Sequence, residues 1–188
     1  MFTKQKTITV TTKDFLEKEA VSYAEFTGKD GMPYLVQVIQ DLSPISPRDD
    51  YDHAWKWVTS PKAGYTDRNV NIDVDDKSYF KAPLFLYRHS GDIISTKPFN
   101  CPWDSGCMGY AYINLEEQQV NEEQALKYLE AEVEEMNLYI SGQVYGVVIT
   151  NLETEEETEA IWGIYGSDYA EVVKDFIPDG VSFCLIDL

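Results

Sequence analysis

Apolar and polar residues alternate in several short runs that are bounded by turn residues. Residues 34–40, YLVQVIQ, follow the turn DGMP and predict a strand. Residues 83–96, PLFLYRHSGDIIST, predict two strands joined by a tight turn, in which Gly91 would supply a positive φ. Residues 108–115, MGYAYINL, predict another strand, with Gly109 as a weak spot or a point of close approach. These runs indicate an antiparallel sheet.

A helical period replaces the alternation over residues 121–142, NEEQALKYLEAEVEEMNLYISG. Asn121 is the expected N-cap, with Gln124 three residues later, and Gly142 can end the helix. The apolar stripe of this helix comprises Leu126, Leu129, Val133, Met136 and Ile140. Its opposite face carries glutamates with a single lysine, so few i,i+4 ion pairs offset the repulsion between like charges. The sequence thus predicts a long acidic amphipathic helix.

Residues 143–166 predict a hairpin around the acidic turn LETEEE. It is followed by a short helix over 167–176, capped by Ser167, and by a closing strand over 181–188. Residues 13–26 predict a further short helix. Residues 41–76 are loop-like because prolines and a glycine interrupt them. This loop-like segment carries the aromatic residues Trp55, Trp57 and Tyr65, and long loops with aromatics are often functional or packed down.

The predicted fold class is α+β, with an antiparallel sheet, one long acidic helix and one or two short helices. The chain has 188 residues, which suits one domain and is enough to bury a core without a disulfide or a metal. We therefore expect a single domain over residues 1–188, with 1–33 as a candidate peripheral segment.

The net charge of −18 is concentrated in one part of the chain. Residues 111–160 hold 13 acidic residues and one basic residue, Lys127, so they carry two thirds of the net charge. Such a chain should repel nucleic acid and anionic membranes, and it should be attracted to basic surfaces such as the nucleic-acid grooves of other proteins. Direct nucleic-acid binding is therefore not expected.

The chain shows neither a secretory signal pattern nor an apolar run long enough to span a membrane, so we expect a soluble cytoplasmic protein. Its three cysteines, Cys101, Cys107 and Cys184, are expected to be reduced thiols, with Cys184 a small buried hydrophobic residue. No cofactor is expected, because fingerprints such as the P-loop, HExxH and GxSxG are absent from the sequence.

The segment 98–110, PFNCPWDSGCMGY, admits three interpretations. In the structural one, Trp103 anchors the loop in the core, Asp104 accepts backbone amides in an Asx-turn and Gly106 takes a left-handed conformation. In the catalytic one, Cys101 is a nucleophile with His89 as base and Asp104 as orienting group. In the third, a zinc ion binds Cys101, Cys107 and His89, although the CxxC spacing and a fourth ligand are missing.

Two groups of acidic residues could hold a divalent cation through oxygen ligands. The first comprises Asp49, Asp50, Asp52 and His53, and the second comprises Asp73 and Asp75. Neither group has EF-hand spacing, so a solvated acidic loop explains both without a metal.

The sequence around this segment resembles a family of uncharacterised proteins carried by bacteriophages and other mobile elements. The shared core is LYxHSGxxxSTxPFxCPWDSGxxG, followed by an acidic helix and a GxVYGxxI strand, and the likeness covers roughly residues 34–165. SPRDDYD resembles the Pro-Arg loop of that family, whereas Arg88 and Cys107 depart from its pattern. The resemblance supplies no catalytic roles. It implies a mobile-element origin, a setting in which inhibitors of host defence are common.

Together these observations favour an acidic DNA mimic that occupies the basic nucleic-acid groove of a host defence enzyme, of the anti-restriction or anti-CRISPR type. The expected partner-binding residues are Glu122, Glu123, Glu130, Glu134 and Glu135 on the long helix, with Glu153, Glu155, Glu156 and Glu157 on the hairpin. One alternative is a small cysteine- and histidine-dependent enzyme or metal-binding protein centred on residues 98–110. Another is a structural or assembly protein that uses the aromatic residues 55–65 as a contact surface, and a homodimer is compatible with each.

Overall fold

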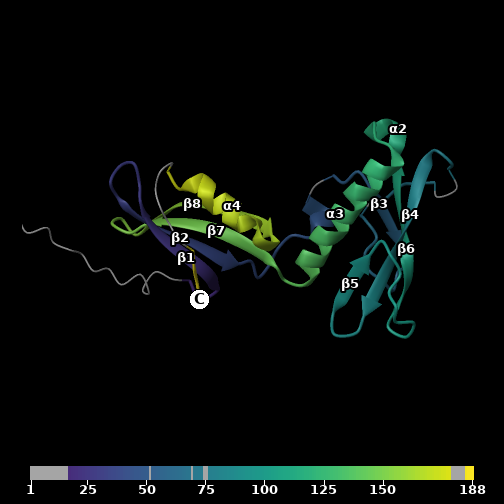
Figure 1. Ribbon diagram of the computed structural model, residues 1–188, viewed down its shortest axis with the longest axis horizontal. Helices are drawn as coiled ribbons and strands as arrows, with labels where there is room; N and C mark the ends of the chain where they lie inside the picture. The colour runs from purple at the N-terminus through teal and green to yellow at the C-terminus, as the bar shows by residue number, and fades with distance from the viewer. Residues whose placement is uncertain (1–16, 51, 69, 74–75, 179–184) are drawn as a thin grey trace, which may run out of the picture. The chain divides into compact units, whose positions relative to one another are not determined.

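The computed structural model describes residues 17–50, 52–68, 70–73, 76–178 and 185–188 (Figure 1). Contacts within the chain divide it into two compact units, a first unit of residues 1–42 with 144–188 and a second unit of residues 43–143. Each unit holds one antiparallel sheet with helices. The α+β class is confirmed, and the expectation of a single domain stays a prediction.

The first unit is built on a five-stranded sheet with the order β8-β7-β2-β1-β9. Its strands are β1 (Ala20–Thr27), β2 (Pro33–Gln40), β7 (Val144–Asn151), β8 (Glu156–Tyr165) and β9 (Ile186–Asp187). A 3-10 turn, η2 (Gly166–Asp168), leads into α4 (Tyr169–Phe176), which lies along the sheet (Figure 1). Apolar side chains of β2 and β7 pack against Val173 and Ile177 to form the core of this unit.

The helix predicted over residues 13–26 is wrong where the structure describes it, because β1 occupies residues 20–27. Strand β1 pairs with β2 from Ala20 opposite Ile39 to Thr27 opposite Pro33. The alanines and glutamates of this segment favour a helix locally, but pairing with β2 and the burial of Ser22 and Ala24 favour the strand.

At the opposite edge of the same sheet, β8 is exposed along most of its length. Its Trp162 lies over Gly146 of β7, where an added Cβ would be only 2.4 Å from a ring carbon of the indole. Glycine at position 146 therefore makes room for the tryptophan, which remains 51% exposed. The predicted hairpin of β7 and β8 is confirmed.

The second unit is built on a four-stranded sheet with the order β3-β6-β4-β5. Its strands are β3 (Lys56–Thr59), β4 (Tyr79–Arg88), β5 (Asp92–Ser95) and β6 (Ser105–Asn114). Its helices are α1 (Pro47–Asp50), α2 (Leu115–Gln118) and α3 (Glu122–Ile140). The long helix α3 crosses the sheet (Figure 1). Its buried side chains join Trp55, Trp57 and Leu84 in one core.

Helix α3 begins and ends as its sequence predicts. Asn121 and Gln124 form a reciprocal capping box. At the other end Gly142 has a φ of 73°, and the amide of Gln143 donates to the carbonyl of Leu138, which gives a Schellman motif. The buried stripe is Ala125, Leu129, Val133 and Met136. Leu126 was expected in this stripe, but it lies at the edge of the helix's buried face and is 39% exposed.

Residues 41–76 are more ordered than predicted, because they contain α1 and β3. Both Trp55 and Trp57 are 0% exposed, and the Trp55 indole donates to the carbonyl of Ala125 at 2.8 Å. An aromatic contact surface over residues 55–65 is therefore wrong for these two side chains, which belong to the core. Strand β3 also lies close to β6, where a Cβ on Gly109 would be 2.3 Å from the Val58 carbonyl oxygen. The close approach expected at Gly109 is thus confirmed.

Several local details differ from the predictions. The hairpin of β4 and β5 forms, but neither Gly91 nor Gly106 has a positive φ. Helix α4 begins after Asp168 rather than Ser167, and its N-cap side chain makes no capping hydrogen bond. The predicted strand over 181–188 is described only at its end, where β9 pairs with β1, and Cys184 lies outside the described residues.

Candidate functional site

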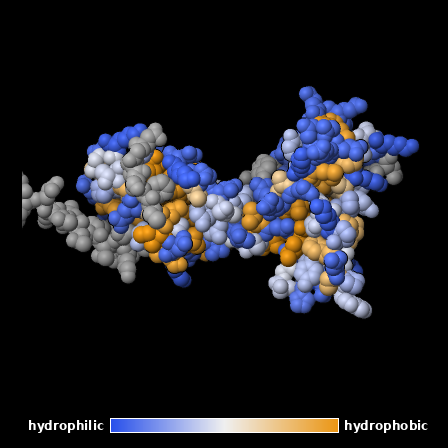
Figure 2. All heavy atoms as spheres, in the orientation of Figure 1, coloured by the Kyte–Doolittle hydropathy of each residue, from blue (hydrophilic) through white to orange (hydrophobic). Residues whose placement is uncertain are grey.

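The exposed side of α3 carries a row of carboxylates. At about 100° of rotation per residue, Glu123, Glu130 and Glu134 fall within about 40° of one another on one flank of the helix. All three are exposed, as is Glu122 in the first turn, whereas Glu135 is half-buried. Figure 2 shows hydrophilic residues gathered over α2 and the first turns of α3. We call Glu123, Glu130 and Glu134 the α3 row.

Two lysines lie near the α3 row. The Lys127 ammonium is 2.9 Å from Glu123, and that of Lys97 is 3.7 Å from Glu130. Both pairs are well exposed, and solvent screening leaves such pairs little net energy. They do not compete strongly with a better-placed cation from a partner.

A groove of about 420 Å³ runs between α3 and β5, and Glu130 and Glu134 line it. Asn137 closes the edge strand at this groove, because its side-chain amide donates to the Ile94 carbonyl at 2.9 Å while its oxygen accepts from the Ile94 amide at 2.8 Å. The two bonds satisfy the backbone amide and carbonyl of Ile94 on this edge strand and tie the helix to the sheet. The α3 row is therefore held on a rigid element.

The acidic residues of the hairpin belong to the first unit. Glu153 and Glu155 lie in the turn, while Glu156 and Glu157 begin β8, and all four are exposed. The Asn151 side chain shapes this turn by accepting from the amides of Glu153 at 2.8 Å and Thr154 at 3.2 Å. The expected partner-binding residues thus form two sets in different units, and each set is a surface of its own.

A buried ionic cluster in the second unit was missed by sequence reasoning. The Arg48 guanidinium binds Asp67 at 2.8 and 2.5 Å, Glu132 at 2.6 Å and the Trp55 carbonyl at 2.8 Å. It also lies over the Trp57 ring, 4.4 Å from the centroid. Glu132 is thereby removed from the acidic face of α3, and its role is to hold α3 to the loop before β3.

His53 borders this cluster and is buried. Its Nε2 lies 2.7 Å from the Pro47 carbonyl oxygen, and its Nδ1 lies 3.7 Å from Glu132. Burial acts to lower the pKa of His53, but the contacts with Glu132 and the Pro47 carbonyl outweigh it and raise the pKa above 6.5. The sequence signal for this cluster is Arg48 within SPRDDYD, the one basic residue of that segment.

In the loop of residues 98–110, Trp103 does not anchor the core, because its side chain is 92% exposed. The Cys101 thiol lies 3.6 Å from an Asp104 carboxylate oxygen, and the Ser105 hydroxyl donates to the Cys101 carbonyl. No Asx-turn bond from Asp104 occurs among the described residues. Because Trp103 does not pack in the core, the loop is held by backbone hydrogen bonds instead. One of these is the 2.7 Å bond from the Arg88 amide to the Asp104 carbonyl.

His89 is not joined to Cys101 or Asp104 by a hydrogen bond within the described part of the chain. Its ring instead stacks on Tyr87, with 6.4 Å between centroids. Cys101 and Asp104 are thus in contact, but His89, the base that the catalytic interpretation requires, is not hydrogen-bonded to either of them.

Arg88, which departs from the family pattern, has a structural partner. It binds Asp92 through two bonds of 2.7 and 2.5 Å, and Tyr65 donates to the same carboxylate at 2.7 Å. The Arg88 hydrogen bonds hold the pKa of Asp92 below its usual value, while burial and the bond to Asp92 raise the pKa of Tyr65 to about 12. This triad ties the β4–β5 hairpin to the loop after β3.

Within the described ranges, no group of three or more His, Cys, Asp or Glu side chains is arranged to hold a metal ion. Asp49 pairs with Arg68 at 3.0 Å and Asp52 with Lys56 at 3.7 Å. Asp75 and the side chain of Asp50 lie outside what the structure describes.

In comparisons with known proteins, no family model, curated protein or solved structure matches the chain. Over the residues that the structure covers, no helix is both long enough and apolar enough to cross a membrane.

Proposed function

We propose that the protein is an inhibitor that mimics DNA, encoded by a phage or another mobile element and acting in the host cytoplasm. In this proposal the α3 row enters the basic nucleic-acid groove of a host defence enzyme of the restriction or CRISPR type. The observation that carries the proposal is the position of Glu123, Glu130 and Glu134 on one exposed flank of a helix whose opposite face is buried.

The spacing of the α3 row supports the proposal. At a rise of about 1.5 Å per residue, Glu130 and Glu134 are about 6 Å apart along the helix axis, and Glu123 is about 10 Å before Glu130. Duplex DNA presents one phosphate for about every 3.4 Å of axis on each strand. The row is sparser than DNA, so it matches a few phosphate-binding side chains of a groove rather than an extended track.

Rigidity adds to the affinity that such a row can give. Leu129, Val133 and Met136 fix the helix in the core, and the Asn137 clamp fixes its flank. Charges held in place before binding lose little conformational entropy on association. A basic groove also attracts the acidic chain over distances comparable with the Debye length, which is about 10 Å at 0.1 M salt.

The hairpin offers a second acidic surface, formed by Glu153, Glu155, Glu156 and Glu157. It belongs to the first unit, so its contribution is separable from that of the α3 row. The two sets can therefore be neutralised one at a time.

The test is capture of nucleic-acid enzymes from a bacterial lysate by the immobilised protein, with mass spectrometry of the bound fraction. The test variant is Glu123→Gln/Glu130→Gln/Glu134→Gln, and the matched control is Glu153→Gln/Glu155→Gln/Glu157→Gln, which removes the same charge from the other unit. We expect capture by the wild type, and a smaller loss of binding for the hairpin variant than for the α3 variant, because the proposal places the main contact on the α3 row. The α3 variant should bind about tenfold to a hundredfold more weakly, since each exposed charge pair contributes up to about 1 kcal/mol.

Two further measurements decide whether capture reflects mimicry. Double-stranded DNA should displace the captured enzyme, and elution should occur as salt rises from about 0.1 to about 1 M, where the Debye length falls to about 3 Å. Capture that resists both salt and DNA, or that survives neutralisation of the α3 row, would show that charge mimicry through α3 is wrong.

A further inference from the structure

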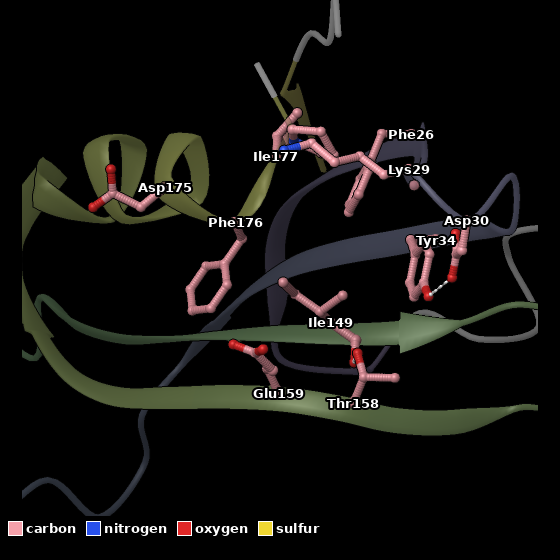
Figure 3. A pocket seen from close by; sticks show the side chains of 12 residues that line it. Phe26, Lys29, Asp30, Tyr34, Ile149, Thr158, Glu159, Asp175, Phe176 and Ile177 are labelled. Atoms are coloured by element: carbon pink, nitrogen blue, oxygen red, sulfur yellow. Dashed lines mark hydrogen bonds between the residues drawn. The ribbon is translucent and has the colours of Figure 1, made fainter.

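The first unit contains a pocket of about 530 Å³, and its lining includes none of the glutamates named above as partner-binding residues. Figure 3 shows Phe26 and Tyr34 from the β1–β2 hairpin on one side and Phe176 from the end of α4 on the other. Ile149 and Glu159 rise between them from β7 and β8. The volume lies within the range of about 300–1,000 Å³ that is usual for small-ligand sites.

Aromatic rings form much of the wall of this pocket. Phe26 and Tyr34 are stacked, with centroids 5.4 Å apart and an angle of 16° between the rings. Phe176 lines the same pocket from α4. The faces of such rings carry negative electrostatic potential, which attracts ammonium and guanidinium groups within about 6 Å.

One carboxylate of the pocket is held in a fixed position. Asp30 accepts from the Met32 amide at 3.0 Å and from the Tyr34 hydroxyl at 2.7 Å. The bond from the Met32 amide has the larger effect and that from the Tyr34 hydroxyl the smaller, and both lower the pKa of Asp30, which keeps the carboxylate ionised. Gly28 makes this arrangement possible, because a Cβ there would be 2.6 Å from both Asp30 Oδ1 and the Tyr34 ring.

The remaining charges of the pocket favour a cationic ligand. Its lining includes the carboxyl groups of Asp30 and Glu159 against the single ammonium of Lys29, while the Asp175 carboxylate points away from the pocket (Figure 3). The backbone of Glu159 pairs with β7, but its carboxylate makes no ion pair or hydrogen bond with the described residues, so its charge is available to a ligand. An anion would meet an excess of negative charge, and a neutral ligand would leave the Glu159 carboxylate without a partner.

We propose that this pocket binds an organic cation, an alkylguanidinium or alkylammonium group, with its charge near Glu159 and its apolar part among Phe26, Tyr34 and Phe176. The cation can be a free small molecule or an arginine side chain of a partner protein. The site lies on the first unit, so it does not depend on the α3 row or on the DNA-mimic proposal.

The test uses NMR titration of the full chain with N-acetylarginine amide, with its neutral isostere N-acetylcitrulline amide as the ligand control. We expect the arginine compound to shift signals of Phe26, Tyr34, Ile149 and Phe176, and the citrulline compound to leave them unchanged. Equal shifts from both compounds, or shifts that map elsewhere, would overturn the proposal.

Variants of the chain sharpen the result. Glu159→Gln should weaken binding of N-acetylarginine amide by about fivefold, because it removes the charge while keeping the shape of the side chain. Glu171→Gln, which neutralises an exposed carboxylate on α4 outside the pocket, should leave the affinity unchanged. Equal affinities of Glu159→Gln and the wild type would also overturn the proposal.

A second pair of ligands separates the two sources of the cation. Tighter binding of an arginine-containing tripeptide than of agmatine indicates a partner's side chain, and the reverse order indicates a free small molecule. The variant with a neutralised α3 row should bind these ligands like the wild type, so failure of the DNA-mimic proposal would leave this result intact.

Discussion

Replacing Arg48 with methionine should destabilise the second unit more than any exposed charge change. Only 6% of the Arg48 side chain is exposed. Its guanidinium binds the carboxylates of Asp67 and Glu132, which are also largely buried. Removing it leaves both carboxylates without their cation, and breaking a buried pair in this way costs about 3–5 kcal/mol. Methionine keeps most of the stem volume, so the loss would report the charge and its hydrogen bonds rather than a cavity.

The assay is urea unfolding followed by circular dichroism, with the midpoint and the slope fitted separately. The matched control is Arg68→Met, because Arg68 pairs with Asp49 at 3.0 Å while its side chain is 79% exposed. We expect little change for the control, since exposed pairs add little to stability. A loss below about 1 kcal/mol for Arg48→Met, with an unchanged slope, would refute the view that this cluster holds α3 to the loop before β3.

Calorimetry of the same variant also tests the predicted single domain. If the chain of 188 residues unfolds as one cooperative unit, a loss of about 4 kcal/mol lowers Tm by about 8–16 °C. If the second unit unfolds alone, the shift is about twice as large and only one of two transitions moves. The number of transitions and the size of the shift therefore have to agree.

Three further predictions concern single side chains. The pKa of His53 is raised in the folded state, so the stability that its protonated ring adds is fully present below the ordinary pKa of 6.5 and is lost as pH rises through the higher folded value. Urea midpoints of the wild type should therefore fall as pH rises across this range, and those of His53→Asn should fall less. Trp103→Ala should leave the urea midpoint within error because the indole is 92% exposed, and a clear drop would mean that the side chain packs after all. Gly109→Ala should cost about 1–3 kcal/mol because its Cβ would meet the Val58 carbonyl at 2.3 Å, whereas Gly106→Ala, which has open space around it, serves as the control.

The sequence predicted best those elements whose local signals agree with their packing. Helix α3 carries a cap at Asn121, an end signal at Gly142 and a 3.6-residue apolar period, and these signals point to the same element. Leu126 was misplaced because an amphipathic period fixes the buried face only to within one position, and the small Ala125 allows the closer approach to the sheet.

Failures occurred where distant residues decide the outcome. Strand β1 has two alanines and one glutamate, which favour a helix, and its pairing with β2 cannot be read from its own residues. Arg48 and Glu132 are 84 positions apart, so nothing local distinguishes Glu132 from the exposed glutamates beside it. Trp103 was placed in the core by hydrophobicity alone, although tryptophan also has a polar group and is frequent at protein contacts.

The four tryptophans give the protein a built-in set of optical probes. Trp55 and Trp57 are shielded in the second unit, whereas Trp103 in that unit and Trp162 in the first unit face the solvent. A soluble collisional quencher should therefore extinguish the long-wavelength emission of the two outer indoles and spare the blue-shifted emission of the inner pair. Phenylalanine substitutions at positions 103 and 162 would assign each quenched component to one unit, so the approach of a partner to either unit becomes visible without an attached dye.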